Sequence, residues 1–365
     1  MPQLIENTLN ILEHDSQQLP LHISIFAAIT ILDYVYNIEG VNQNYLEVEK
    51  RLKTLINKME LPTRDGSAAR LHLSLLYGEH TDKLTSEMDE LLEQFNGSTE
   101  VEIKDFLMDN YIERGIYKEA VEINRQAKVF FQNEIAAHSI DVLMKVDDDF
   151  QYLQLMLGNI EQAHEQIENQ LVPYFTNHLP DHWLASRLEK HCIPFSYHYS
   201  IQEIERYCKA PYFLAEGSLG TNNFWTEKLL AKLVWWFALQ DETPEEKQYV
   251  SKLENAFQDN LNYYKIEKLN VLVRYYLNRA NVDKATKYIG LLEAALTEYA
   301  ADIYTVHQDS FAMYQAELAI QLNTPELARE YLSAIADSVC QYHPKNYLRM
   351  HLKQVEEKTK SNICK

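Results

Sequence analysis

The stretch from Val101 to Glu134 constrains the fold more than any other part of this sequence. It contains two amphipathic helical patterns joined at Gly115. In the first pattern the apolar residues recur at spacings of three, four and five, so they share one helical face. The second pattern contains two small residues, Ala120 and Ala127, which allow a neighbouring helix to approach closely. Because neither helix can bury its apolar face alone, the pair needs stacked neighbours of the same kind.

Distances between equivalent residues indicate that this helix pair recurs along the chain. Gly115 and Gly158 lie 43 residues apart, and the same interval separates Ala285 from Ala328. These intervals predict helix pairs of one type on both sides of the middle of the chain, near residues 101, 144, 266 and 309.

The scarcity of turn residues supports a helical fold. The 365 residues include only 9 glycines and 10 prolines, well below the usual fractions of about 7% and 5%. Proteins built from sheets need such residues more often, whereas Leu, Ala, Glu and Lys favour helices. The sequence therefore predicts an all-α protein, an α-α superhelix or solenoid of antiparallel helix pairs.

One unit also carries a family signature. The residues with the spacing of the tetratricopeptide repeat are Leu107, Tyr111, Gly115, Tyr117, Ala120 and Ala127. The stretch from Val101 to Glu134 resembles that family, although the usual Trp near the start and Pro at the end are absent. The resemblance implies a TPR-like solenoid in which the first helix of each pair lines a concave groove that binds a peptide or a protein.

The same resemblance implies a set of groove residues. Carried over to the matching units, the groove-facing positions are Asp105, Asp109, Glu113, Asp148, Tyr152, Asn270, Arg274, Asn278, Met313 and Glu317. The first two units are acidic at these positions, and among the rest only Arg274 is basic. The chain thus departs from the subfamily that grips a terminal carboxylate with lysines and asparagines. We expect a basic or amphipathic peptide, with simple solvation of some carboxylates as the alternative.

Composition divides the chain into five parts. They are N-terminal helices and divergent helix pairs in 1–97, TPR-like pairs in 98–171, an aromatic and proline-rich part in 172–225, TPR-like pairs in 226–357 and a tail in 358–365. In the first part, helices are expected at 3–15, 21–38, 44–59, 70–77 and 84–95. Further on, helix starts are predicted at Ser200, at Thr243-Pro244 and at Pro344.

The part from 172 to 225 differs from its surroundings. It holds four of the ten prolines and is rich in Tyr, Phe and His. We expect short helices interrupted by ordered aromatic loops. Such a part is either a joint between two helical stacks or an elaborated binding region.

Charge and cysteine content bound the partners and the compartment. A net charge of −20 disfavours nucleic acid and membrane surfaces as partners. The four cysteines are too few for a disulfide framework in a chain of this length. The N-terminal residues are acidic where a signal peptide would be basic, and the longest uncharged run is shorter than the ~20 residues of a membrane span. These features predict a cytoplasmic protein with free thiols.

An aspartate cluster and several histidines were weighed as chemical sites. Asp147, Asp148 and Asp149 resemble the magnesium-binding clusters of helical prenyl-chain enzymes, but Gln151 stands where a further acidic residue is needed. An exposed acidic turn is therefore the preferred interpretation.

His178 and His182 have the spacing of a zinc-binding pair, but Pro180 lies between them and disfavours a regular helix. Capping and aromatic packing are preferred for these histidines. His191 beside Cys192 suggests a base and a nucleophile, yet adjacent residues rarely face each other. A buried or idle thiol is the preferred interpretation, and the sequence predicts neither a metal nor a cofactor.

The sequence is compatible with three functions. The preferred one is a non-enzymatic scaffold or adaptor that binds a protein or peptide. The second is a regulatory sensor of a short signalling peptide, and the third is a helical enzyme with its site in 172–225. The aromatic residues, which include 24 tyrosines, permit a self-association surface such as a dimer interface.

Overall fold

The computed structural model describes residues 2–15, most of 47–54, residue 104, and residues 107–112, 114–133, 140–256, 263–298 and 305–364. The chain divides into two compact units, Met1–Leu107 and Met108–Lys365. The helices expected at 21–38, 70–77 and 84–95, and the candidate residues Asp105 and Glu113, lie outside the described residues.

In the first unit, helix α1 covers Pro2–Asp15 and confirms the helix expected at 3–15. Leu9 and Leu12 of α1 and Leu52 of the later helical stretch are buried. The Arg51 guanidinium donates to three side chains of α1, namely Glu6, Asn10 and Glu13, at 2.8–3.0 Å. Arg51 therefore links this stretch to α1.

The described part of the second unit is helical and contains no strand. Its N-terminal helices are α7 (Tyr117–Asn133), α8 (Ile140–Met156), α9 (Ile160–Gln166) and a π-helical turn at Ile167–Leu171. The middle helices are α10 (Val172–His178), α11 (Asp181–Glu189), α12 (Cys192–Ser196), α13 (Ile201–Cys208) and α14 (Ala210–Leu219). The C-terminal helices are α15 (Phe224–Ala238), α16 (Glu246–Asn255), α17 (Tyr263–Asn278), α18 (Val282–Glu298), α19 (Thr305–Gln321), α20 (Pro325–Ala334), α21 (Ala336–Val339) and α22 (Tyr347–Thr359).

Four tight turns repeat the same backbone geometry. The turn residues with positive φ are Gly115 (73°), Gly158 (85°), Ala280 (50°) and Asn323 (58°), each two residues before a helix. The next N–H donates to the carbonyl five residues earlier at 2.8–3.0 Å, which ends the preceding helix in a Schellman-type cap. Gly115 and Gly158 confirm the interval of 43 residues, and Ala280 and Asn323 repeat it.

Each turn is followed by an alanine where two helices cross. Ala120, Ala163, Ala285 and Ala328 all have 0% exposure. A larger side chain at these positions would separate the paired helices, because the distance between helix axes depends on residue size at the crossing. The structure thus confirms the helix pairs predicted from the sequence.

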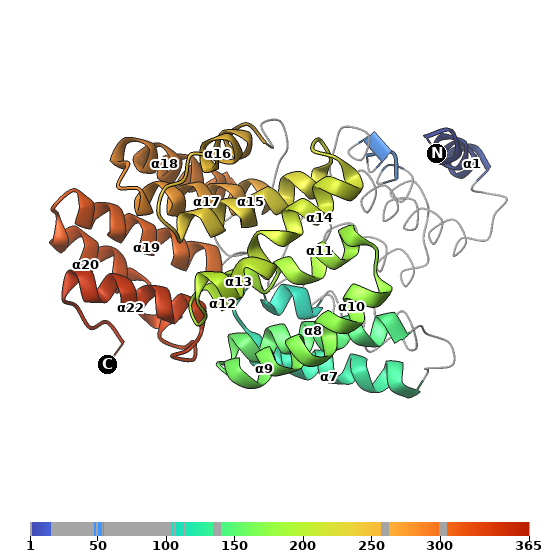
Figure 1. Cartoon of the computed structure of the whole chain (residues 1–365), viewed down its shortest axis with the longest axis horizontal. Coiled ribbons are helices and arrows are strands. Elements are labelled where there is room, and N and C mark those ends of the chain that lie inside the picture. The colour runs from blue at the N-terminus through green and yellow to red at the C-terminus, as the bar shows by residue number, and fades with distance from the viewer. Residues whose placement is uncertain are drawn as a thin grey trace. The chain divides into compact units, whose positions relative to one another are not determined.

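The helix pairs stack so that their first helices lie inside. In the C-terminal half, α15, α17 and α19 pack side by side, and α22 packs on α19 (Figure 1). Helices α15 and α17 are buried on nearly all sides, whereas α16, α18 and α20 each keep an exposed face. This arrangement confirms an all-α solenoid. None of the described helices is long and apolar enough to span a membrane.

The part from 172 to 225 consists of the expected short helices. The start at Ser200 is a capping box, in which its hydroxyl accepts from Glu203 N–H and the Glu203 carboxylate accepts from Ser200 N–H. Its aromatic residues Phe195, Tyr207 and Tyr212 are fully buried in the core that also includes α8 and α17. This packing favours a joint between two helical stacks.

Two expectations about this unit were wrong. All four cysteines are paired, as Cys192–Cys208 and Cys340–Cys364, so the thiols are not free. Sequence spacing did not reveal the pairs, because the members lie 16 and 24 residues apart and meet only through the packing of short helices. Helix α16 begins at Glu246, slightly later than Thr243-Pro244 predicts, although Thr243 N–H does donate to the Glu246 carboxylate at 3.2 Å.

Candidate functional site

The described candidate groove residues lie on the first helices of the stacked pairs. Asp148 and Tyr152 are on α8, Asn270, Arg274 and Asn278 are on α17, and Met313 and Glu317 are on α19. Asp109 lies on the helical stretch before Gly115 and is exposed. We call the side of these first helices on which their charged side chains meet the inner face.

Asp148 is part of a buried ion-pair cluster. Its side chain is 1% exposed and lies 2.5 Å from Lys190 Nζ and 2.9 Å from His191 Nε2. Burial alone would raise the pKa of Asp148, but Lys190 and His191 outweigh it and hold the pKa well below its usual range. The interpretation of this cluster as an exposed acidic turn is therefore wrong, because its central carboxylate joins α8 to the residues around α11 and α12.

A second charge cluster continues along the inner face. Glu189 on α11 pairs with Lys228 at 3.2 Å and with Lys232 at 3.3 Å on α15. Lys232 also pairs with Glu267 on α17 at 2.5 Å. Burial raises the pKa of Glu189, but the two lysines outweigh this and bring it to about 2. The sequence analysis missed this cluster, although a lysine inside the apolar run of α15 already indicates a buried acidic partner.

The third cluster brings two candidates together. Arg274 NH1 donates to the Glu317 carboxylate at 3.3 Å and to His351 Nε2 on α22 at 2.9 Å. Burial lowers the pKa of His351, and the neighbouring guanidinium lowers it further, so the neutral imidazole can accept this bond. Burial raises the pKa of Glu317, but Arg274 outweighs it and the carboxylate stays ionised. Trp235 lies under the guanidinium at 6.0 Å.

Asn270 lies one helical turn before Arg274 on α17. Its Nδ2 lies 3.1 Å from His307 Nδ1 on α19. Its Oδ1 and the Nε–H of Arg274 are buried, and neither has a hydrogen-bond partner among the described residues. An acceptor and a donor are therefore left unused one turn apart on the same helix.

The remaining candidates have different environments. Asn278 is exposed, and its Nδ2 donates to Ala238 O at 2.9 Å. Met313 is completely buried in a core formed by α19, α20 and α22. The Tyr152 ring is half-buried, with its centroid 6.4 Å from that of His191. Arg274 and Glu317 are thus in direct contact, whereas Met313 contributes to packing.

The backbone spacing of Asn270 and Arg274 along α17 is close to the two-residue repeat of an extended peptide. Four residues of helix rise about 6 Å, and an extended chain repeats its N–H and C=O groups every two residues, about 6.6 Å. An extended peptide along α17 could therefore donate to Asn270 Oδ1 and accept from Arg274 Nε–H. A buried pair of this kind favours a ligand with alternating donors and acceptors.

The residues weighed as chemical sites all have partners within the chain. His178 and His182 lie on separate helices, α10 and α11. His191 is bonded to Asp148, and Cys192 is in a disulfide. Among the described residues no His, Cys, Asp and Glu group has the arrangement of a metal site. These contacts give the histidines, the cysteine and the aspartate structural roles within the described part of the chain.

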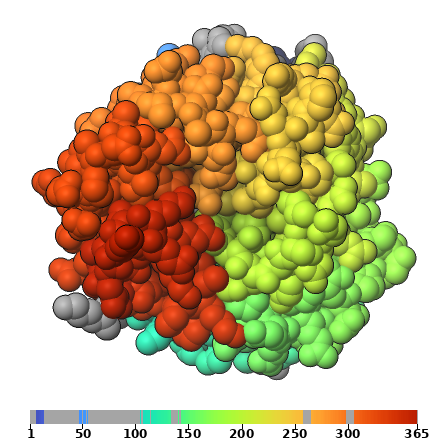
Figure 2. Space-filling view, turned by 60° about the vertical axis from the view of Figure 1, so that its left-hand side comes forward, coloured from blue at the N-terminus to red at the C-terminus, as the bar shows by residue number. Residues whose placement is uncertain are grey.

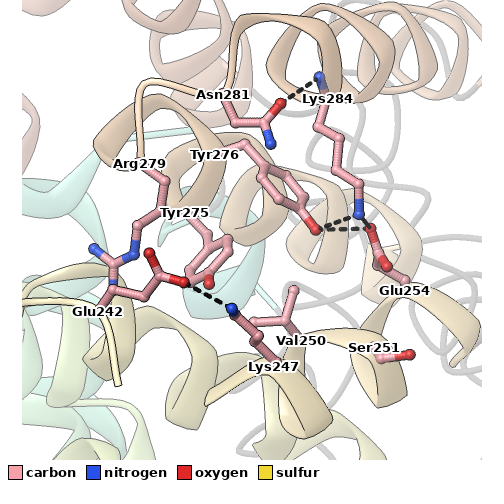
Figure 3. A pocket seen from close by; sticks show the side chains of 10 residues that line it. All are labelled: Glu242, Lys247, Val250, Ser251, Glu254, Tyr275, Tyr276, Arg279, Asn281 and Lys284. Atoms are coloured by element: carbon pink, nitrogen blue, oxygen red, sulfur yellow. Dashed lines mark hydrogen bonds and ion pairs between the residues drawn. The ribbon is translucent and has the colours of Figure 1, made fainter. Parts of the chain in front are cut away.

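A separate pocket of about 470 Å³ lies between α16, α17 and α18 (Figure 3). Its polar groups bind one another. The Glu254 carboxylate accepts from Lys284, Tyr276 and Tyr288, each at 2.8 Å. The Arg279 guanidinium is occupied by Glu246 and by backbone carbonyls. We interpret this pocket as part of the packing between helix pairs, since these polar groups already have partners.

The comparisons with known proteins support the fold. No protein-family model and no curated protein matches the sequence. Among solved structures, a Rap protein in complex with competence and sporulation factor matches with a TM-score of 0.58 and 8% identity. The match covers 92% of this chain and 98% of that chain. At this identity the likeness shows a shared fold, a TPR-like helical solenoid.

Proposed function

We propose that this protein binds a short extended peptide along the inner face of α17. The observation that carries the proposal is the buried acceptor of Asn270 one turn from the buried donor of Arg274. A buried polar atom without a hydrogen-bond partner costs free energy. A ligand that bonds to both atoms removes this cost, which favours binding.

The environment favours an amphipathic peptide over a strongly basic one. Arg274 lies among the rings of Trp235, Tyr197 and Tyr314, which give this part of the inner face an apolar lining. The carboxylates of Asp148 and Glu317 already have cationic partners. A basic peptide would therefore gain little from these two carboxylates.

A regulatory sensor is the form of this function that we favour. The Rap structure with a similar fold contains competence and sporulation factor, which supports a signal-binding role for this architecture. A scaffold that holds a protein partner is the alternative. Affinity purification separates the two, because a scaffold retains one stoichiometric protein, whereas a sensor binds a short peptide and changes its compactness in small-angle scattering. Asp109→Lys should weaken capture if the partner is basic.

A peptide titration tests the proposed site. A positional-scanning library of synthetic hexapeptides selects a ligand, and calorimetry measures its affinity. Asn270→Ala should weaken binding about 5- to 150-fold, because removal of one buried acceptor costs about 1–3 kcal/mol. Asn255→Ala is the matched control, since Asn255 lies exposed on α16 and donates to Ser251 O. Equal affinities of the two variants would remove Asn270 from the site, and the absence of any selected peptide would contradict the function.

We expect the protein to act in the cytoplasm, as the sequence suggests. Paired cysteines are uncommon there, because cellular reductants keep thiols reduced. Alkylation of thiols in intact cells followed by mass spectrometry would determine which cysteines are paired in the native compartment.

A further inference from the structure

The loop between α21 and α22 connects two ends of the second unit. It covers Cys340–Asn346, and we call it the clasp. The sequence predicts a helix from Pro344, but α22 begins only at Tyr347, with Asn346 as its N-cap. The clasp residues contact residues much earlier in the chain, between Tyr117 and His198. Figure 2 shows the C-terminal residues directly against residues of the N-terminal and middle helices.

Two clasp side chains occupy the places where two turn glycines lack a side chain. A Cβ added at Gly115 would overlap the Tyr342 ring, and a Cβ added at Gly158 would overlap the His343 ring. The Tyr342 ring also packs on Tyr117, with 5.8 Å between centroids. The equivalent turns at the C-terminal end carry Ala280 and Asn323 at similar positive φ. Glycine therefore occurs at the two turns that the clasp covers.

The clasp also satisfies polar groups of the N-terminal helices. Asn346 Nδ2 donates to Met156 O at 3.0 Å, which gives a partner to a carbonyl at the end of α8. Lys345 O accepts from His198 Nε2 at 2.8 Å. Lys345 Nζ pairs with Glu161 at 2.8 Å, but both side chains are largely exposed and this pair adds little. The contact is therefore built from the half-buried Tyr342 ring, the exposed His343 ring and hydrogen bonds to two backbone carbonyls.

The helix that follows the clasp covers the proposed site. His351 and Gln354 of α22 contact the Arg274 guanidinium, and the Tyr197 ring from the α12 side lies 6.2 Å from that of His351. Movement of the clasp away from α8 and α9 would separate α22 from Tyr197. The seam between them is the boundary that a ligand has to cross to reach Asn270 and Arg274.

We propose that the clasp holds the second unit in a closed form and that a ligand reaches the inner face only after the clasp opens. The ligand part of this inference rests on the proposed function, whereas closure is a property of the chain alone. Closed and open forms then exchange, and a peptide that binds the open form shifts the population toward it.

Energy transfer between fluorophores tests closure without any ligand. The fluorophores are placed at the exposed positions Glu165 on α9 and Lys353 on α22 by genetic-code expansion. Gly158→Ala should raise the open fraction at least tenfold, because the new Cβ displaces His343. Gly220→Ala is the control for a Cβ at positive φ without an overlap, since Gly220 has a φ of 85° with a ψ of 166° and no atom within 4 Å of its added Cβ. Equal energy transfer in both variants would overturn the proposal.

Two further variants guard against simple misfolding. Adding His343→Ala to Gly158→Ala should restore closure, because the overlapping ring is gone. If Gly158→Ala does not fold, Asn346→Ser keeps an N-cap hydroxyl for α22, removes the bond to Met156 O and should also raise the open fraction. A closed seam in that variant would contradict the clasp.

Hydrogen exchange tests whether the clasp covers the inner face. In an open variant, the backbone amides of α12 and of the first turn of α22 should exchange at least tenfold faster than in the parent. Unchanged exchange in a variant with an open seam would overturn the gating role. The selected hexapeptide should associate at least tenfold faster with the open variant; failure to bind either form would contradict the proposed function and leave the closure result intact.

Discussion

The two ends of the second unit use the same turn with different residues. At the N-terminal end the left-handed positions are Gly115 and Gly158, whereas at the C-terminal end they are Ala280 and Asn323. The cap hydrogen bonds have the same lengths at both ends. Backbone conformation therefore does not by itself require glycine, and the difference lies in the clasp, which leaves no room for a Cβ at the first two turns.

The two ends also differ in how their buried charges are supported. In the N-terminal half Asp148 has three basic neighbours, Lys190, His191 and Arg187. In the C-terminal half the Glu317 carboxylate depends chiefly on Arg274, with Lys358 exposed and His351 neutral. A cluster with several partners tolerates the loss of one, so the two halves should respond differently to the same kind of change.

The largest expected effect comes from breaking the C-terminal pair. Arg274→Leu leaves the buried Glu317 without its main partner and should cost about 3–5 kcal/mol of unfolding free energy. Lys190→Met should cost less, because Asp148 keeps His191 at 2.9 Å. Urea unfolding measures both losses. Adding Glu317→Leu to Arg274→Leu should recover much of the stability, and equal losses in the two single variants would break the comparison.

Asp309 contacts Tyr342 of the clasp, and its replacement should raise the free energy of unfolding by an amount that depends on pH. Burial raises its pKa to about 6, although Ser338 and Tyr342 donate to the carboxylate. Since the folded pKa lies above the unfolded value of 3.8, its contribution to stability is complete below that value and falls as pH rises to about 6. Asp309→Asn should therefore raise stability at pH 7.5 by up to about 3 kcal/mol.

At pH 4 the difference between Asp309→Asn and the parent should nearly vanish. Parallel urea titrations at pH 7.5 and pH 4 check this expectation. Glu189, with its pKa near 2, behaves in the opposite way, because its stabilisation is present above the unfolded pKa and is lost as pH falls toward 2. A constant effect of Asp309→Asn across this range would show that its carboxyl group does not titrate near 6.

A smaller effect is expected at the N-terminal turns. Gly115→Ala adds left-handed strain of about 1–2 kcal/mol and also overlaps the Tyr342 ring. Ala280→Gly measures that strain alone, because Ala280 has a positive φ in an equivalent turn. Thermal unfolding should therefore show a larger loss for Gly115→Ala than the gain for Ala280→Gly. Shifts of equal size would mean that Tyr342 moves away at no cost, and the distinction between the two ends would then disappear.

The smallest effect belongs to the C-terminal turns. Ala280→Gly removes a Cβ at a φ of 50° and should stabilise the protein by about 0.5–1 kcal/mol, because the relief of left-handed strain exceeds the added entropy of the unfolded chain. Thermal unfolding measures this change, and a lower melting temperature would show that the Ala280 methyl group makes favourable contacts.

Sequence periodicity was sufficient for the helix pairs and their spacing. Gly115, Gly158, Ala120 and Ala163 are local signals, because turn geometry and helix crossing act within one pair. The positions of the candidate groove residues on the first helices were also predicted, but their burial and their hydrogen-bond partners were not. Whether Asp148 is exposed depends on Lys190 and His191, about 40 residues later, and no local pattern contains that information.

The clasp is a second feature that local sequence patterns do not predict. Pro344 is a favourable residue for a helix start, and the sequence alone predicts one there. The helix begins later because Tyr342 and Asn346 contact residues near Gly115 and Met156. Contacts over such separations follow from how the solenoid curves, which depends on the packing of every helix pair between them.

Asn346 uses both ends of one amide, since its Oδ1 accepts from Leu348 N–H while its Nδ2 donates to Met156 O. The two residues are 190 positions apart. At about 5–20 residues per second, translation leaves α8 without this partner for roughly 10–40 s. During synthesis the end of α8 is therefore bonded to water, and the N-terminal helices have to hold together before the chain that completes them exists.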